Sequence, residues 1–422
     1  MDVQFDPRQI ELMKRVEAAR GHLFYFIPLK SVGPISFIDV DELKKENMFT
    51  DAECESFRDT PIYMFGSNNY LGLTEHPEVM AAAIAAIDLN GTGCTGSRFL
   101  NGTLGEHRRL ERKLAAAIGK EEARLLPTGY QSNLILGALA TSQEDIIILD
   151  YLDHASIKDG ARLSTFGLDK GFMYRHNDMA SLEEKLKLAR AKNPRNIFVV
   201  FDGVFSMEGD LANLPEIVAL AEKYHAVTVD DEAHAMGVFG KTGMGVAQHY
   251  GLTDRVDIIT GTFSKSWACI GGFVAANSQI INYLTWHTSP FMFSASSPPS
   301  IIATVDKCLD ITVSEEGARL RKQLFDNAHH LRGGLKDMGY NTGDSDSPIV
   351  PVIIGNPDMT VVLGEMMLKR YHVFTNVVPE KAVPKGMEML RASVMATHKP
   401  ADIDDVLKSF YKAGVQLNLI SA

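Results

Sequence analysis

Residues 227–272 read VTVDDEAHAMGVFGKTGMGVAQHYGLTDRVDIITGTFSKSWACIGG, and two short, largely apolar runs in this stretch each lead to polar residues. The run at 227–229 leads to Asp231, and the run at 256–259 leads to Ser264-Lys265-Ser266. Short apolar runs are typical of buried strands in α/β sheets, and such sheets bind ligands at the carboxyl ends of their strands. We therefore expect a carboxylate and a lysine at a ligand-binding sheet edge.

The preceding sequence repeats this pattern. Apolar runs occur at 146–152 and 197–201, and LLPTG at 125–129 is strand-like. Helical patterns lie at 76–89, 105–119 and 214–224, the last with Pro215 in its first turn, where a missing N–H costs little. Strands alternating with helices predict βαβ crossovers and a mostly parallel sheet, which is an α/β fold.

The two ends of the chain differ from this middle part. Residues 1–60 are expected to form an N-terminal arm, with a helical pattern at 7–20 and an acidic segment at 39–58, and the large domain is expected to cover 61–298. A long helical stretch from Pro299 to Met338 precedes strand-like segments at 348–354, 372–377 and 388–394 and a closing helix from Ala401. These segments predict a smaller α+β domain over 299–422.

Composition excludes several classes of protein. The 422 residues are 45% hydrophobic and 23% charged, which is near the globular average and excludes collagen, a disulfide-rich miniprotein and extensive disorder. The net charge of −11 argues against a protein built mainly to bind nucleic acid, so no nucleic acid partner is expected. The four cysteines lie far apart without CxxC spacing, which is typical of reduced thiols in the cytoplasm and predicts no metal site.

The sequence also lacks membrane signals. The N-terminus has no apolar core typical of a signal peptide, and no apolar run approaches the ~20 residues that span a bilayer. We expect a cytoplasmic protein without a transmembrane segment, which leaves room for transient contact with a membrane surface.

Two motifs resemble nucleotide-binding signatures without their context. Gly91 to Gly96 fits GxGxxG, but the residues before it are helical and those after it are loop-like, whereas the dinucleotide motif follows a strand and opens a helix. DEAH at 231–234 precedes Gly240-Lys241-Thr242, and Ala235 occupies the position where a P-loop has its first glycine. Neither motif predicts nucleotide binding.

Lys265 is a candidate for covalent chemistry, although most lysines are solvated surface charges. Hydroxyl residues flank it, and the aromatic residues Phe263 and Trp267 bracket it. A lysine in such a pocket can lose its proton and form a Schiff base. Together with Asp231 as the partner of a pyridinium nitrogen, Lys265 provides the minimal set of groups that binds pyridoxal phosphate (PLP).

Further residues could complete a PLP site. Thr128-Gly129-Tyr130 opens a helical segment, where backbone N–H groups can bind phosphate, and Thr262 and Ser264 add hydroxyls. His154 follows the run at 146–152 and is expected at the same sheet edge, with an ordinary half-buried histidine as the alternative.

Several ordered segments of this sequence resemble the α-oxoamine synthases, fold-type I PLP enzymes that condense an amino acid with an acyl-CoA and release CO₂. They are SNNYLGL at 67–73, GTGCTGSRFLNGT at 91–103, TGY at 128–130, LDHASIKDGARLS at 152–164, DGVFSMEGDLANLP at 202–215, DEAHAMGVFG at 231–240 and GTFSKS at 261–266. The resemblance runs from about residue 60 to the C-terminus and implies an aminotransferase-like fold. GTFSKS, SRFLNGT and LRASVMATH are most similar to the bacterial members that use serine and a long-chain acyl-CoA.

The resemblance implies a role for each matching residue. Lys265 would form the Schiff base with the PLP aldehyde, and Asp231 would keep the pyridine nitrogen protonated. His234 would hydrogen-bond the phenolic oxygen with Ser206 nearby, and His154 would stack on the ring. The implied phosphate ligands are Gly129, Tyr130, Thr262 and Ser264, together with Ser294 and Ala295 from the second subunit of a homodimer.

Substrate binding is implied in the same way. Arg391 would bind the amino acid carboxylate through its planar fork, with a structural ion pair as the alternative. The sequence departs from the family at Trp267-Ala268-Cys269, where a smaller residue is common. This departure bears on the shape of the pocket and so on the substrate.

The implied activity is a decarboxylating condensation of L-serine with a long-chain acyl-CoA, giving a 3-oxo amine, 3-ketosphinganine. An alternative within the family uses glycine or alanine, or a different acyl thioester such as a carrier-bound one. A second alternative is a non-catalytic partner subunit, of the kind that lacks the lysine in related complexes. The presence of Lys265, Asp231 and both histidines argues against that alternative.

Overall fold

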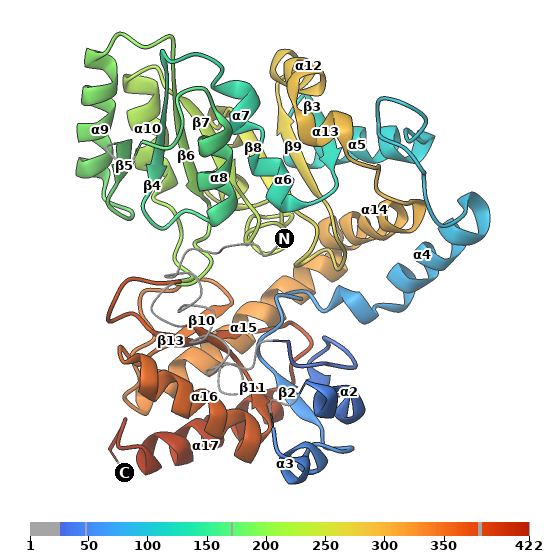
Figure 1. Cartoon of the computed structure of the whole chain (residues 1–422), viewed down its shortest axis with the longest axis vertical. Helices are drawn as coiled ribbons and strands as arrows, with labels where there is room; N and C mark the ends of the chain where they lie inside the picture. Colours follow the sequence, from blue (N-terminus) through green and yellow to red (C-terminus); the bar gives the residue numbers. More distant parts are fainter. Residues whose placement is uncertain (1–25, 47–48, 170–171, 379–381, 422) are drawn as a thin grey trace, which may run out of the picture. The chain divides into compact units, whose positions relative to one another are not determined.

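The computed structural model describes residues 26–46, 49–169, 172–378 and 382–421 (Figure 1). They divide into two compact units, one spanning Asn68–Phe325 and one that combines the described residues up to Ser67 with those from Asp326 onward. The predicted helix at 7–20 lies outside the described residues. The division into an arm, a large domain and a small domain at residues 60 and 298 stays a prediction.

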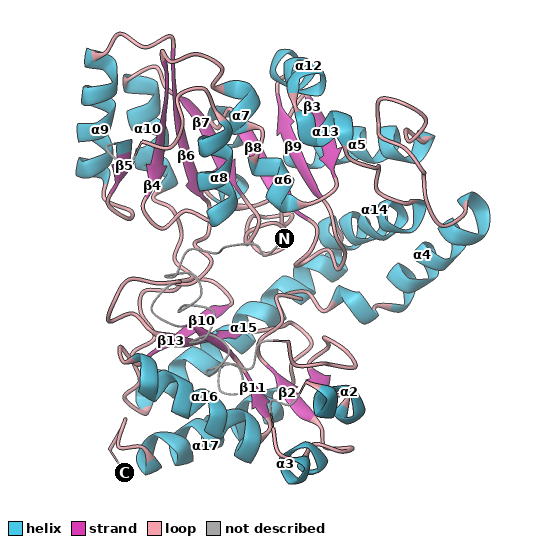
Figure 2. Cartoon of the chain, viewed as in Figure 1, coloured by secondary structure: helices cyan, strands magenta, loops and turns pink. Residues whose placement is uncertain are grey.

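A seven-stranded sheet forms the centre of the unit Asn68–Phe325, in the order β3-β9-β8-β7-β6-β4-β5 (Figure 2). Its strands are β3 (Glu122–Leu126), β4 (Asp145–Asp150), β5 (Met173–Tyr174), β6 (Asn196–Asp202), β7 (Val227–Asp231), β8 (Ile258–Thr262) and β9 (Gly272–Ala276). Strands β4 to β8 pair in parallel, and β9 runs antiparallel to β8 and β3. The predicted α/β fold with a mostly parallel sheet is confirmed.

The helices of this unit follow the predicted alternation. They are α4 (Pro77–Asn90), α5 (Gly105–Ile118), α6 (Gly129–Asn133), α7 (Leu136–Leu139), α8 (Ala155–Leu163), α9 (Met179–Ala191), α10 (Leu214–Lys223), α11 (Val246–His249), α12 (Ser278–His287), α13 (Ser289–Phe293) and α14 (Pro299–Val313). Apolar residues of β4, β6 and β8 pack with Ile135, Ile157 and Ile281 in one buried cluster. This packing fixes one face of the sheet against α7, α8 and α12.

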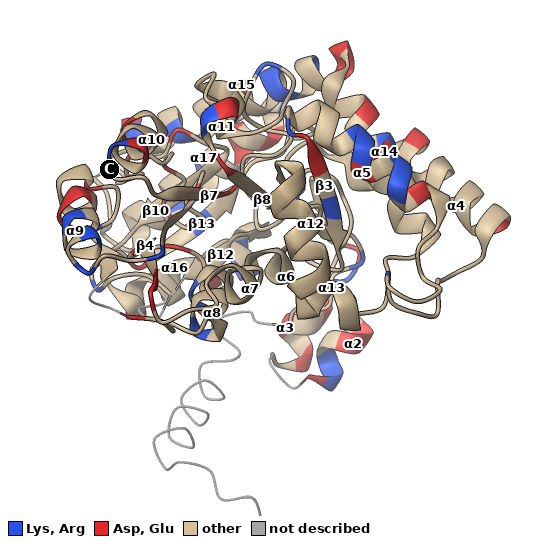
Figure 3. Ribbon diagram, turned by 90° about the horizontal axis from the view of Figure 1, so that it is seen from above, with Lys and Arg blue, Asp and Glu red and all other residues tan. Residues whose placement is uncertain are grey.

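The outer helices carry charges of both signs on their solvent-facing sides. Acidic and basic residues are interspersed along α5 and α9 (Figure 3). On α9, Glu183 pairs with Lys187 at 3.0 Å, and such i,i+4 pairs stabilise exposed helices only slightly. Most of the stability of these helices therefore comes from their buried faces.

The second unit contains two three-stranded sheets. One has the order β10-β13-β12, with β10 (Ile349–Ile353), β12 (Asn376–Val378) and β13 (Met389–Ser393). The other has the order β1-β2-β11, with β1 (Ile35–Ser36), β2 (Ile62–Met64) and β11 (Val373–Phe374). Its helices are α2 (Val40–Lys45), α3 (Asp51–Ser56), α16 (Pro357–Tyr371) and α17 (Pro400–Gln416). The predicted α+β character of the C-terminal region is confirmed.

The predicted helical stretch from Pro299 to Met338 consists of two helices. The chain forms α14 and then α15 (Glu315–Asp337), with Ser314 between them in an extended conformation. The backbone N–H of Gly317 donates to Ser314 Oγ at 3.4 Å, and Glu315 and Glu316 follow in the first turn. Serine followed by acidic residues is a helix-start signal, so a new helix begins where apolar periodicity alone predicts continuation.

A membrane-crossing helix would need a long apolar stretch, and none of the helices in the described part of the chain has one.

Candidate active site

A cavity of about 200 Å³ lies at the carboxyl ends of the parallel strands. Asp202, Asp231 and Thr262 are the last residues of β6, β7 and β8. The cavity is lined by Gly129, Tyr130, His154, Ser156, Asp202, Ser206, Asp231, Ala233, His234, Thr262, Ser264 and Lys265. The structure thus brings together nine of the twelve site residues expected from the sequence.

Asp231 is held by two hydrogen bonds. Asn133 Nδ2 donates to Asp231 Oδ2 at 2.6 Å, and the backbone N–H of Ala233 donates to Oδ1 at 3.0 Å. Asn133 is itself oriented, because its Oδ1 accepts from Thr260 Oγ1 at 2.9 Å. The carboxylate of Asp231 is therefore fixed in direction as well as buried.

His154 is the N-cap residue of α8 and is linked to the same group of residues. Its Nδ1 lies 2.7 Å from Ser156 Oγ, and Asn133 Nδ2 donates to that hydroxyl at 2.9 Å. Loss of hydration lowers the pKa of His154, and the Lys265 ammonium adds to this effect while Asp231 opposes it. A neutral ring is the form that accepts a hydrogen bond at Nδ1 from the serine hydroxyl.

His234 has a buried partner on the segment before α4. The hydroxyl of Tyr70, which is fully buried, lies 2.7 Å from His234 Nδ1. This contact orients the imidazole of His234, which lines the cavity.

Lys265 lies on the short connection between β8 and β9. The Thr262 hydroxyl donates to the Gly271 carbonyl at 3.0 Å and lies 2.8 Å from Ser264 Oγ. Ala268 has a φ of 66°, and Gly271 has a φ of 138°. These left-handed positions turn the chain sharply, so that β9 returns beside β8 and the lysine stays at the sheet edge.

Trp267 does not line the cavity. Its side chain is 1% exposed and stacks on Phe263 with 5.6 Å between ring centroids, and its Nε1 donates to Thr312 Oγ1 at 3.0 Å. The expectation that Trp267 shapes the pocket is therefore not supported by its position, because the indole belongs to the packing between this connection and α14.

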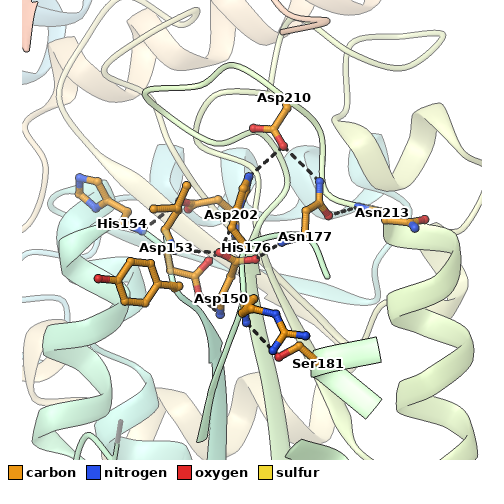
Figure 4. A network of polar contacts seen from close by, with 12 residues as sticks. Asp150, Asp153, His154, His176, Asn177, Ser181, Asp202, Asp210 and Asn213 are labelled. Carbon is orange, nitrogen blue, oxygen red and sulfur yellow. Dashed lines mark hydrogen bonds and ion pairs between the residues drawn. The ribbon is translucent and has the colours of Figure 1, made fainter. Parts of the chain in front are cut away.

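Sequence reasoning did not name three of the residues that line the cavity, Ser156, Asp202 and Ala233, nor Asn133 and Tyr70, which hydrogen-bond Asp231 and His234. Asp202 Oδ2 accepts a hydrogen bond from the backbone N–H of His154 at 3.0 Å (Figure 4). Burial and the neighbouring Asp231 raise the pKa of Asp202 well above its ordinary value. Asp202 ends the apolar run at 197–201, so the rule that predicted Asp231 could also have found it.

Three expected site residues lie outside the cavity lining. Ser294 Oγ accepts a hydrogen bond from Gln131 Nε2 at 3.1 Å within the same chain, and Ala295 forms a bridge with Ser97. Arg391 lies on β13 in the other unit, where its Nη1 donates to Ser393 Oγ at 2.7 Å. The roles expected of these residues stay predictions.

The cavity fits PLP by its donor set. A lysine amine, a buried carboxylate and two histidine rings stand together with the hydroxyls of Ser206 and Ser264. The backbone of Gly129 packs tightly against Thr262, because a Cβ at this glycine would lie 2.5 Å from Thr262 Cβ. Glycine at position 129 therefore lets the N-terminus of α6 pack directly against the end of β8, and a helix N-terminus presents backbone N–H groups of the kind that bind phosphate.

Comparisons with known proteins agree with this geometry. The aminotransferase class I and II family matches residues 60–410. The serine palmitoyltransferase of Bacteriovorax stolpii is 44% identical over 366 residues, covering 86% of this chain and 85% of that protein. The 8-amino-7-oxononanoate synthase of Thermoanaerobacter pseudethanolicus is 39% identical over 402 residues, covering 93% of this chain and 100% of that protein.

A solved structure of a serine palmitoyltransferase with a PLP internal aldimine is also similar. It superimposes with a TM-score of 0.86 at 33% identity, covering 99% of this chain and 98% of that one. The chain therefore belongs to the aminotransferase class I and II family, in the α-oxoamine synthase branch that its motifs predict.

Proposed function

We propose that this chain is a PLP-dependent acyltransferase that condenses L-serine with a long-chain acyl-CoA, releasing CoA and CO₂ and forming 3-ketosphinganine, a sphingolipid precursor. One observation carries the proposal: Lys265, Asp231, His154 and His234 line one cavity in a fold similar to that of a solved serine palmitoyltransferase. The 44% identity to a bacterial serine palmitoyltransferase favours serine as the amino acid.

Bound PLP supplies an electron sink that stabilises negative charge at the amino acid Cα. Lys265 provides the amine that holds the cofactor and, once released by the incoming amino acid, the base that takes the Cα proton. Lys265 is partly buried and lines the cavity beside Asp231 and both histidines, where its amine would hold the cofactor.

Asp231 keeps a proton on the pyridine nitrogen by facing it with negative charge. The hydrogen bonds from Asn133 and Ala233 fix the direction of this carboxylate, so no reorganisation is needed when charge develops. His234, oriented by Tyr70, would hydrogen-bond the phenolic oxygen.

As a neutral imidazole, His154 would pack against the cofactor ring, and Lys265 would act as the base that takes the Cα proton. Arg391 would bind the serine carboxylate, for which its planar guanidinium is a bidentate partner.

We also propose a cytoplasmic homodimer in which Ser294 and Ala295 complete the phosphate site of the neighbouring subunit. In support, neither residue lines the cavity that contains Lys265 of its own chain. The four cysteines are free thiols, which fits a reducing compartment.

The cofactor link is tested by reducing the loaded protein with borohydride and mapping the labelled peptide. We expect the label on Lys265, and Lys265→Ala should lose both label and turnover while phosphate contacts retain part of the cofactor. The matched control is Lys241→Ala, an exposed lysine outside the cavity, which should keep label and rate. A label on another lysine would refute the assignment.

The substrates are tested with serine, glycine and alanine against acyl-CoAs of increasing chain length, following free thiol release and product mass. Serine with a long-chain acyl-CoA should give the highest kcat/KM. A higher value for glycine or alanine would overturn the serine assignment and leave the reaction class standing. Activity only with a carrier-bound acyl group would replace acyl-CoA as the donor.

A further inference from the structure

The segment 150–154, which joins β4 to α8 and ends in His154, has its backbone held by carboxylates. The N–H of Asp150 donates to Asp153 Oδ2 at 2.9 Å, and the N–H of Leu152 donates to Asp150 Oδ1 at 2.8 Å. The N–H of His154 donates to Asp202 Oδ2 at 3.0 Å. Three buried carboxylates thus fix the backbone that presents His154 to the cavity (Figure 4).

These carboxylates are also linked to the neighbouring strand. The N–H of Asp202, at the end of β6, donates to Asp153 Oδ1 at 3.1 Å. Burial, Asp150 and Asp202 together raise the pKa of Asp153 well above its ordinary value. Such a group of buried acids is costly unless positive charge or protons balance it.

His176 supplies positive charge at one end of this group. Its Nδ1 lies 3.0 Å from Asp150 Oδ1, and its Nε2 lies 3.1 Å from Asp210 Oδ2. An imidazole with a carboxylate at each nitrogen carries both protons and is a cation. Although burial opposes it, these hydrogen bonds raise the pKa of His176 to about 10.

Through its contact with Asp210, His176 also binds a second loop beside the cavity. Asp210 lies in the connection after β6 that also carries Ser206, and the N–H of Phe205 donates to the Asp210 carbonyl at 3.0 Å. Asn177 joins both carboxylates, since its N–H donates to Asp150 Oδ2 at 2.9 Å and its Nδ2 donates to Asp210 Oδ2 at 3.1 Å. Asp150, His176 and Asp210 therefore form a clamp between the two loops, which we term the His176 clamp.

We propose that His176 is a positioning residue for the reaction: by bridging Asp150 and Asp210 it holds segment 150–154 in the conformation that presents His154 to the cofactor. The catalytic consequence rests on the proposed function, in which His154 packs on the ring. His176 does not line the cavity and acts through the backbone of its neighbours.

The direct test is amide hydrogen exchange in His176→Gln, measured on peptides covering 150–154 in the cofactor-free and PLP-loaded proteins. A hydrogen bond to a charged group contributes ~1.5–3 kcal/mol, so these amides should exchange at least about tenfold faster than in the parent protein. Peptides from β7 and β8 should be unchanged. The matched control is His330→Gln, whose Nε2 lies 2.8 Å from Asp404 on the partly exposed surface of the other unit. It should leave segment 150–154 at the parent rate.

The second measurement concerns the turnover and the cofactor spectrum of the PLP-loaded enzyme. In His176→Gln, kcat should fall about tenfold or more with little change in the KM for serine, and the visible circular dichroism of bound PLP should change because its ring packing is altered. Asp210→Asn keeps the Asp150 contact and should give the same changes in smaller measure, which provides the test if His176→Gln does not fold.

Unchanged exchange at 150–154 would overturn the proposal. Faster exchange with a parental PLP spectrum and parental kcat would also overturn it, because the segment would then move without affecting His154. If the parent protein fails to turn over serine, the proposed function fails, while the exchange result still decides whether the His176 clamp holds the segment.

Discussion

Both oxygens of the Asp231 carboxylate accept a hydrogen bond from the protein, one from Asn133 and one from the backbone of Ala233. These contacts leave negative charge on a group whose direction is fixed. A carboxylate in this position differs from a neutral amide mainly in charge, since the two have nearly the same shape. Substitution by asparagine therefore isolates the electrostatic role.

Asp231→Asn should retain PLP and lose at least about a hundredfold in turnover, because each ~1.4 kcal/mol of lost stabilisation costs a factor of ten. The measurement is exchange of the serine Cα proton in deuterated water, followed by NMR, with the cofactor content determined in parallel. Asp306→Asn, which removes a surface carboxylate 2.6 Å from Lys113, serves as control and should exchange at the parent rate. Near-parental exchange in Asp231→Asn would contradict the proposed role.

The residues that sequence reasoning found and missed differ in a physical way. Asp231 and Lys265 follow apolar runs, so the end of a buried strand marks their position. Asn133 contacts Asp231, which is 98 positions away in the sequence, and Tyr70 contacts His234, which is 164 positions away. Nothing in the local sequence distinguishes Asn133 and Tyr70 from ordinary polar and aromatic residues. Their roles follow only from the folded arrangement.

At the scale of elements, the connection between β8 and β9 is anchored to α14 by Trp267. The indole is buried, stacks on Phe263 and donates to Thr312 Oγ1. The same connection carries Lys265, so the packing of Trp267 supports the lysine without reaching the substrate.

Trp267→Phe should lower the free energy of unfolding by about 1–3 kcal/mol, since it removes one buried hydrogen bond and leaves a partly filled space. The ratio of kcat/KM for serine to that for glycine should stay within about twofold of the parent value. Denaturant unfolding and steady-state kinetics measure the two effects. Trp286→Phe, at a tryptophan that is 65% exposed, is the control for stability. A change in amino acid preference would show that Trp267 shapes the pocket after all.

His398 links the segment after β13 to the end of β2. Its ring stacks on Phe65 at 4.1 Å between centroids, accepts from the Met395 N–H at 3.0 Å through Nδ1, and donates to the Met64 carbonyl at 3.0 Å through Nε2. Burial lowers the pKa of His398 to about 4. The folded unit thus holds this ring neutral at a pH where the unfolded chain protonates it.

Between pH ~6.5 and pH 4 the unfolded state binds the additional proton, so the stability contributed by neutral His398 is present above pH ~6.5 and is lost on acidification. Lowering the pH from 7.5 to 5 should cost about 2 kcal/mol through this residue. His398→Gln should be less stable at neutral pH and should show a correspondingly weaker loss over the same range, as measured by denaturant unfolding. An unaltered slope in His398→Gln would contradict the assignment.

Strands β6, β7 and β8 lie close to their expected bounds because each is a nearly continuous buried apolar run. Helices α5 and α10 do so because each has one apolar face, and α4 also matches its expected bounds although Val79 is its one buried residue. Strand β9 was missed because it begins at Gly272, directly after the turn at Gly271, and two consecutive glycines are typical of a loop. The break at Ser314 was missed because α14 and α15 are both amphipathic, so the apolar pattern continues across it.

At the scale of the whole molecule, the proposed homodimer predicts that two different inactive variants restore activity when they are mixed. A Lys265→Ala protomer cannot hold the cofactor covalently, and a Ser294→Asp protomer places negative charge where its partner would bind phosphate. Each variant alone should be nearly inactive. A mixed dimer contains one site with both Lys265 and Ser294, so mixing should restore activity to a fraction of the parent value.

The control mixture of Lys265→Ala with the parent chain should show no activity beyond that of the parent chain alone. A fully active monomer in sedimentation would exclude the shared site.

The pairing of β2 with β11 has a consequence for how the chain is made. Tyr63 pairs with Val373, so a strand near the beginning of the chain finds its neighbour only among the last fifty residues or so. On the ribosome, Asn68–Phe325 can collapse around its own sheet during synthesis, whereas β2 must wait with an unpaired edge until β11 has been made. The second unit can therefore be completed only after the first, and truncation before β11 should expose the β2 edge and promote aggregation.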